Sequence, residues 1–80
     1  MSTPRYGGSL VEWIEADGFG EIATAGHAPL PVYREELVRA GMMPPKIGAR
    51  CTFEIGATHK GNTGAINVEK VPEVHLGKVQ

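Results

Sequence analysis

The sequence predicts an all-β domain: a small barrel of five antiparallel strands with a short helical turn after the third strand. Five short runs of strand-forming residues follow one another and are separated by turn residues. The 11 glycines are spread along the chain, as in proteins with tight corners between strands. Only one brief segment has a helical pattern. Pattern alone leaves a five-stranded sandwich and an SH3-like barrel open as alternatives.

The first three strands are predicted from strand formers and the turns between them. Residues 9–15 are rich in β-branched and aromatic side chains, and Asp17 and Gly18 then form a turn signal. Residues 19–24 form the second strand. Residues 30–33 fit a short third strand, which Pro31 confines to a sheet edge or an irregular site.

The second half of the chain contains the helical segment and the last two strands. Residues 34–40 are the helical candidate, and Gly41 ends them. The clearest alternation lies in residues 49–55, the fourth strand, and residues 65–71 form the fifth. Within the helical segment, Leu37 and Val38 are candidates for burial, and Glu35 and Arg39 are spaced as an i,i+4 pair.

The core is predicted from the alternation of apolar residues along the strands. Cys51 shares the inward parity of the fourth strand, so we expect a buried, unreactive thiol. Trp13 cannot be placed by alternation, because it shares parity with a core position; a strong bend in the first strand would resolve this. The predicted core residues are Val11, Ile22, Val32, Phe53, Ile55, Ile66 and Val68.

Composition and charge limit the classes of function. The chain of 80 residues suffices for one domain, and a net charge of −1 argues against binding phosphate chains mainly by bulk electrostatics. Residues 1–40 hold three basic and six acidic side chains, and residues 41–80 hold five basic and three acidic ones. One cysteine excludes a disulfide framework, and no metal or other cofactor is expected. No apolar run could span a bilayer and no secretion signal is visible, so we expect a cytoplasmic protein without membrane contact.

Five motifs, in order, resemble the cold-shock domain family over residues 8–71. They are Val-Glu-Trp-Ile at 11–14, Asp-Gly-Phe-Gly-Glu-Ile at 17–22, Pro-Val-Tyr-Arg-Glu-Glu-Leu at 31–37, Gly-Ala-Arg-Cys-Thr-Phe-Glu-Ile at 48–55, and Lys-Gly at 60–61 leading to Ala-Ile-Asn-Val at 65–68. The resemblance implies an oligonucleotide-binding-type (OB-fold-like) barrel. We expect residues 1–7 to be a flexible arm and residues 72–80 a tail.

The resemblance also implies a function, namely binding of single-stranded RNA or DNA by stacking bases on outward aromatic side chains. Trp13, Phe19 and Tyr33 would form a reduced platform, and Arg34 would stack on a base or contact phosphate. The expected electrostatic contribution comes from four further side chains, Lys46, Arg50, His59 and Lys60.

The departures from the family pattern fall where binding is expected. Glu12 and Asp17 stand where the family has lysines, Glu21 stands where it has its second stacking phenylalanine, and Pro31 and Tyr33 replace a phenylalanine and a histidine. The alternative is therefore a protein-interaction or regulatory module that kept the barrel and lost nucleic acid binding. The Met-Met-Pro-Pro segment at 42–45 either covers a barrel end or meets such a partner. No nucleophile–base pair or paired carboxylate site is visible, so we do not expect an enzyme.

Overall fold

The computed structural model describes residues 3–72 and consists of five strands and one short helix in that part of the chain. The elements are β1 (Tyr6–Ile14), β2 (Phe19–Ala23), β3 (Leu30–Tyr33), α1 (Arg34–Ala40), β4 (Arg50–Ala57) and β5 (Thr63–Lys70). The predicted order of elements is confirmed, and the predicted bounds of β3 and α1 are those observed. No helix in the part described is long and apolar enough to cross a membrane.

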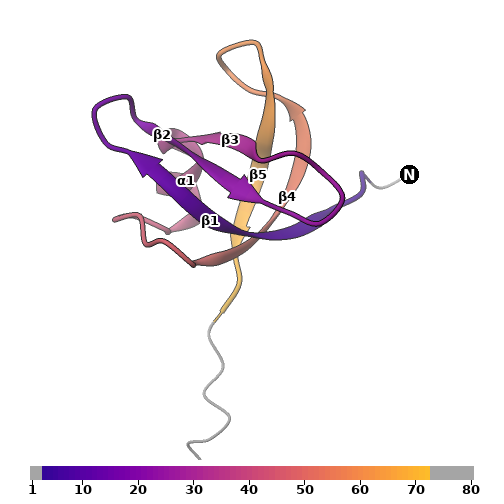
Figure 1. The fold of residues 1–80 in the computed structure, drawn as a ribbon, viewed down its shortest axis with the longest axis horizontal. Helices are drawn as coiled ribbons and strands as arrows, with labels where there is room; N and C mark the ends of the chain where they lie inside the picture. Colours follow the sequence, from indigo (N-terminus) through magenta and orange to yellow (C-terminus); the bar gives the residue numbers. More distant parts are fainter. Residues whose placement is uncertain (1–2, 73–80) are drawn as a thin grey trace, which may run out of the picture.

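All five strands belong to one antiparallel sheet in the order β3-β2-β1-β4-β5 (Figure 1). The long strand β1 pairs with two partners: its second half lies beside β2, and its first half lies beside β4. β1 begins at Tyr6, three residues earlier than predicted, so Tyr6 and Gly7 belong to the sheet and not to the expected arm. Residues 1–2 of that arm and residues 73–80 of the expected tail lie outside the described residues.

A β-bulge in β1 explains why the predicted burial of Val11 is wrong. Leu10 pairs with Ile22, but the next pair is Glu12 with Glu21, so one extra residue is inserted at Val11. Such an insertion resets the two-residue alternation of side chains. Leu10 is therefore almost fully buried, whereas 45% of the surface of Val11 is exposed.

A second irregularity, in β5, explains the position of Ile66. Thr52 pairs with Glu69 and Glu54 pairs with Ile66, so two residues of β5 lie opposite Phe53. Asn67 adopts the left-handed backbone conformation there, with φ +50°, which asparagine tolerates better than most residues. As a result Ile66 is only half-buried, and its predicted core position is not observed.

The core lies between the strands and α1. The burial predicted for Ile22, Val32, Phe53, Val68 and Cys51 is confirmed, while Ile55 is half-buried and packs against the core from its margin. The fully or nearly fully buried apolar residues are Leu10, Ile22, Leu30, Val32, Leu37, Met42, Cys51, Phe53, Ala65 and Val68.

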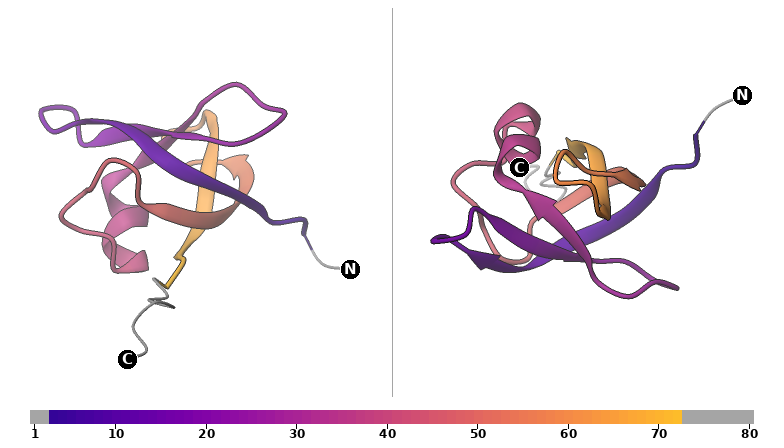
Figure 2. Two further views of the ribbon diagram at one scale, coloured as in Figure 1. Left: turned by 60° about the horizontal axis from the view of Figure 1, so that its bottom comes forward. Right: turned by 90° about the horizontal axis from the view of Figure 1, so that it is seen from above.

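The helix α1 lies against the two edge strands, β3 and β5 (Figure 2). Within α1, the side chain of Leu37 is buried in the core, whereas Val38 points outward and is 60% exposed. Gly41 ends the helix with φ +74°, and the Met42 amide then donates to the Leu37 carbonyl at 2.8 Å. Arg39 pairs with Glu36 and not with Glu35 as the spacing suggested.

The two edge strands, β3 and β5, come together without a hydrogen-bonded ladder among the described residues. The approach is tight at Gly64, where a β-carbon would lie 2.5 Å from the carbonyl oxygen of Pro31. A proline has no amide hydrogen to donate to a neighbouring strand, so Pro31 suits this unpaired edge. The structure therefore shows a curved five-stranded antiparallel sheet whose edges touch.

Candidate nucleic-acid interface

Three rings from three different segments form a continuous row, the aromatic row of Phe19, Tyr33 and His59. Phe19 in β2 pairs directly with Tyr33 in β3, and their ring centroids are 5.7 Å apart. The imidazole of His59, in the loop between β4 and β5, meets the Tyr33 ring edge-on at 5.1 Å. Phe19 and Tyr33 are half-buried and His59 is exposed, so the row presents aromatic surface to solvent.

The β4–β5 loop holds His59 and Lys60 in place beside this row. The Thr58 amide donates to the Asn62 carbonyl at 2.8 Å, and the Gly61 amide donates to the Thr58 carbonyl at 2.9 Å. The Asn62 side-chain amide also donates to the Tyr33 hydroxyl at 3.1 Å, which ties the loop to β3. The loop is therefore closed upon itself, and Lys60 lies exposed next to His59. Nothing in the sequence pattern pointed to Asn62, because this bond joins segments 29 residues apart.

Trp13 lies apart from the row, in a separate group formed with Glu15 and Arg34. It pairs with Gly20, whose β-carbon would lie 2.8 Å from the indole ring, and it packs against the core. The guanidinium carbon of Arg34 lies 5.6 Å from the indole centroid, within the range of a cation–π contact. Among the described aromatic contacts, none joins Trp13 to Phe19 or Tyr33.

Glu15 holds this group together. Its carboxylate accepts the indole N–H of Trp13 at 2.9 Å and a guanidinium N–H of Arg34 at 3.1 Å. The hydrogen bond from Trp13, followed by the hydrogen bond and charge of Arg34, lowers the pKa of Glu15. Arg34 is thus already paired with a carboxylate, and a nucleic acid phosphate would have to compete with Glu15 for it.

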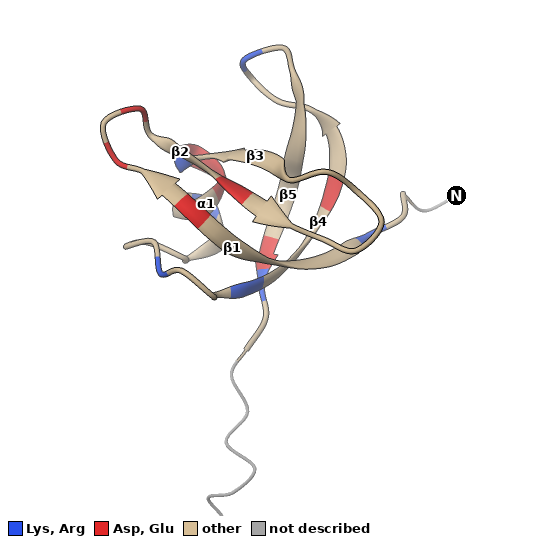
Figure 3. Cartoon of the chain, in the orientation of Figure 1, with Lys and Arg blue, Asp and Glu red and all other residues tan. Residues whose placement is uncertain are grey.

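Carboxylates flank the aromatic row on the β1–β2 side. Glu12 and Glu21 lie directly opposite each other in the register, and Glu21 shares a strand face with Phe19, two residues away. Asp17 lies exposed in the turn between the two strands. Figure 3 shows these acidic positions along the β1–β2 hairpin, with a basic position at the tip of the β4–β5 loop. The β1–β2 flank of the row is therefore acidic, and Lys60 lies in the loop on its other flank.

The structure does not bring Arg50 to the aromatic row. Arg50 begins β4 and pairs with Ser9 of β1, whereas His59 and Lys60 follow the other end of β4. Lys46 lies with Arg50 along a different hollow. Of the residues predicted to bind nucleic acid, the structure therefore gathers Phe19, Tyr33, His59 and Lys60, and it places the other four elsewhere.

A hollow of about 360 Å³ lies beside Tyr33 and His59. Ile66 forms part of its apolar surface, and Glu35 and Glu36 line its helix side. An oxygen of the Glu35 carboxylate is 3.7 Å from the His59 ring nitrogen Nε2. Such a hollow offers acceptor oxygens to the exocyclic amines of a base, while its negative side disfavours phosphate.

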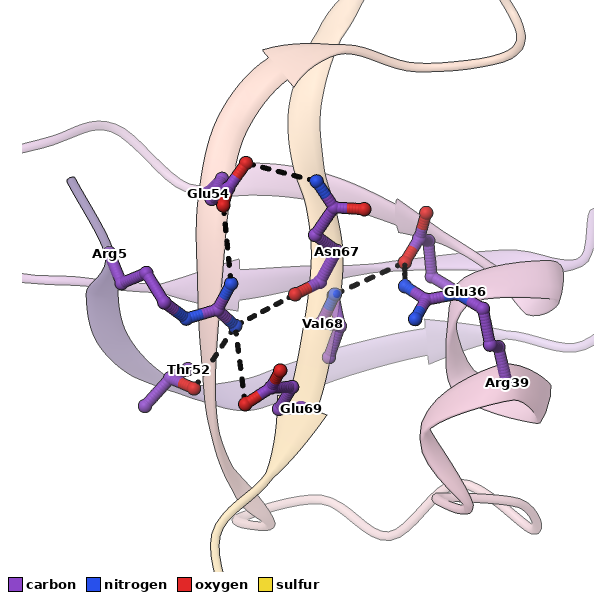
Figure 4. A network of polar contacts seen from close by, with 8 residues as sticks. All are labelled: Arg5, Glu36, Arg39, Thr52, Glu54, Asn67, Val68 and Glu69. Carbon is purple, nitrogen blue, oxygen red and sulfur yellow. Dashed lines mark hydrogen bonds and ion pairs between the residues drawn. The ribbon is translucent and has the colours of Figure 1, made fainter. Parts of the chain in front are cut away.

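The outer surface of β4 and β5 is occupied by a network of polar contacts with a structural role (Figure 4). Arg5 donates to the Asn67 carbonyl at 2.7 Å and to the Thr52 hydroxyl at 3.2 Å, and it pairs with Glu54 at 3.5 Å. Glu36 of α1 accepts the Val68 amide at 3.2 Å, which satisfies a donor at the irregularity in β5. These groups bind one another, so their polar atoms are used within the fold.

A function for this chain has to be argued from its fold and from the contacts described above. Within residues 3–72, no three His, Cys, Asp or Glu side chains gather as a metal site requires. No protein-family model, curated protein sequence or solved structure matches this chain.

Proposed function

We propose that this chain is a cold-shock-like OB barrel that binds single-stranded RNA or DNA through the aromatic row. The observation that carries the proposal is the continuous, solvent-facing contact of Phe19, Tyr33 and His59. Flat side chains on adjoining strands accept successive bases, and each stacked base contributes about 1–3 kcal/mol. Lys60 beside His59 is placed to meet the phosphate that joins such bases.

The arrangement of strands supports the barrel. A long bulged β1 that pairs with both β2 and β4, a short helix after β3, and edges that meet at Gly64 and Pro31 are features expected of a five-stranded Greek-key barrel. In OB-type barrels the surface of the second and third strands is the usual place for an oligonucleotide. The aromatic row begins on those strands in this chain.

The acidic flank determines the expected character of the binding. Glu12 and Glu21 repel phosphate, although exposed charges lose much of their effect at physiological salt. Stacking is then the larger contribution, and affinity is expected to be modest with a shallow salt dependence.

A titration monitored by backbone chemical shifts tests the proposal. The probe is a mixed-sequence single-stranded DNA of about 8 nucleotides, compared with RNA of the same sequence, at low salt. The amide signals of Phe19, Tyr33, His59 and Lys60 should move most. His59→Ala should weaken binding about fivefold to a hundredfold, which corresponds to loss of one stacked base.

The matched control is His27→Ala. His27 is exposed like His59, but it lies outside the row and its ring meets Tyr6. Its removal should leave affinity within about twofold. Equal losses in the two histidine variants, or shifts that avoid the row altogether, would show that this surface does not bind single strands.

A protein-interaction module is the second candidate, and the Glu12–Glu21 pair favours it. Two carboxylates face each other across β1 and β2 beside the row, where they discourage phosphate and would attract a basic peptide. Chemical-shift changes around Glu12 and Glu21 with a lysine-rich peptide, combined with none for oligonucleotides, would favour this candidate.

A further inference from the structure

A second and larger hollow, of about 990 Å³, lies where the α1–β4 connection meets the start of β4 and the end of β5. Its apolar surface is aliphatic and comes from Met42, Met43, Ile47 and Val71. Ile47 is 60% exposed, so its side chain is available to a ligand. Methionine adapts its shape readily and is common at protein-binding surfaces.

Three cations surround this aliphatic surface: Lys46, Arg50 and Lys70. All three are exposed, and no described lining residue of the hollow carries a carboxylate. None of the ion pairs among residues 3–72 involves them. Figure 3 shows basic positions in the α1–β4 connection, at the start of β4 and at the end of β5. The hollow therefore combines apolar surface with positive charge.

Backbone hydrogen bonds hold the walls of the hollow in place. The Gly48 amide donates to the Leu10 carbonyl at 2.7 Å, and the Leu10 amide donates to the Ala49 carbonyl at 2.9 Å. The Val71 amide donates to the Arg50 carbonyl at 3.2 Å, which joins the cationic ends of β4 and β5. A ligand would therefore meet a preformed surface and would lose less free energy in ordering it.

We propose that this hollow docks an acidic, leucine-containing segment of a partner protein. Carboxylates of the segment would meet Lys46, Arg50 and Lys70, and its aliphatic side chains would cover Ile47 and the half-buried Met43. A nucleic acid fits the hollow less well, because its lining contains no aromatic ring on which a base could stack. The proposal does not use the aromatic row, so it stands independently of the proposed function.

The test measures binding of a fluorescein-labelled amphipathic peptide of about 12 residues, with glutamates on one helical face and leucines on the other. Fluorescence anisotropy with the full chain at low salt should show saturable binding that weakens as salt is added. A peptide with lysine in place of glutamate should not bind. Absence of saturable binding by the acidic peptide would overturn the proposal.

Two pairs of variants locate the binding surface. The double variant Lys46→Glu/Lys70→Glu should weaken peptide binding at least about tenfold, whereas Lys60→Glu, at the β4–β5 loop, should not weaken it. Ile47→Ser should weaken binding about threefold to tenfold, whereas Val38→Ser should have little effect. Val38 is a close match because it is also 60% exposed and lies on α1 outside the hollow.

All these substitutions are at exposed positions, and thermal unfolding of each variant checks that the fold is retained. Equal peptide affinity in the Lys46→Glu/Lys70→Glu and Lys60→Glu variants would overturn the proposal. So would a result in which reversing Lys46 and Lys70 abolishes oligonucleotide binding and leaves peptide binding intact, since the hollow would then hold nucleic acid.

Discussion

Replacing Glu21 by phenylalanine should strengthen single-strand binding by extending the aromatic row. Glu21 is two residues from Phe19 on the same strand face, opposite Pro31 on β3 and Glu12 on β1. The new ring would add one stacking surface, worth about 1–3 kcal/mol. Glu21 is half-buried at the surface, and removal of its carboxylate adds about 1 kcal/mol or less. Together these effects predict tightening of about fivefold to several hundredfold, and adding Asp17→Lys should tighten binding slightly further.

The same substitution should also stabilise the fold slightly. Like charges directly opposite on neighbouring strands destabilise a sheet, and cross-strand pairs contribute about 0.2–1 kcal/mol each. Glu21→Phe removes the repulsion from Glu12. Anisotropy of a labelled single-stranded oligonucleotide measures the affinity, and thermal unfolding measures the stability.

The control for this experiment is Glu69→Phe on β5. It makes the same chemical change away from the row, with only a weak ion pair to Arg5 at 4.0 Å at risk. Glu35 is a poor control site, because its carboxylate lies 3.7 Å from His59 in the row. If Glu21→Phe folds normally yet binds no better than Glu69→Phe, the surface of β2 and β3 is not a stacking platform in this protein.

Three further predictions follow from local contacts. Because the hydrogen bonds from Trp13 and Arg34 lower the folded pKa of Glu15, its contact with Trp13 should be intact above the usual glutamate pKa, persist as pH falls past that value, and be lost only as pH falls through the folded pKa. The indole N–H resonance of Trp13 should report this midpoint, and a midpoint at or above the usual glutamate pKa would contradict the contact. Gly20→Ala should lower the free energy of unfolding by about 1–3 kcal/mol, because its β-carbon would lie 2.0 Å from a backbone oxygen. Gly7→Ala should change the free energy of unfolding little, because a β-carbon added at Gly7 would meet no atom within 4 Å. Equal melting temperatures for the two variants would refute the close approach of Gly20 to the β1 backbone. Burial raises the pKa of the Cys51 thiol, so a thiol reagent should modify it slowly unless the protein is unfolded.

Sequence alternation located about half of the core and failed at the two bulges. Ile22, Val32 and Phe53 lie in regular stretches of strand, where side chains alternate every two residues, and their burial was predicted correctly. At Val11 and Asn67 one strand carries an extra residue, so the prediction of Val11 and Ile66 as core residues was wrong. Neither bulge leaves a recognisable pattern in the sequence. A bulge depends on how a strand pairs with its partner, and the sequence of one strand alone does not show that pairing.

The candidate site was predictable in its residue types but not in its grouping. The family resemblance named Trp13, Phe19 and Tyr33 as one platform, and in the structure only Phe19 and Tyr33 of these three are in ring contact. Trp13 is displaced from them by the same bulge that exposes Val11, since the bulge places Trp13 opposite Gly20. Arg50 was grouped with Lys60 because both are basic. In the structure Arg50 begins β4, whereas Lys60 lies in the loop that follows the other end of β4.

The uneven charge of the sequence becomes a spatial separation in the fold. The acidic first half places Glu12, Asp17 and Glu21 beside the aromatic row, and the basic second half places Arg50 and Lys70 at the other hollow. Screening at physiological salt confines each field to within about 8 Å, so each surface acts on its own ligand. A polyanion is drawn to the hollow by charge, and to the row mainly by stacking, with Lys60 beside His59 as a nearby cation. For an oligonucleotide, steep salt dependence therefore indicates binding at the hollow, and shallow dependence indicates binding at the row.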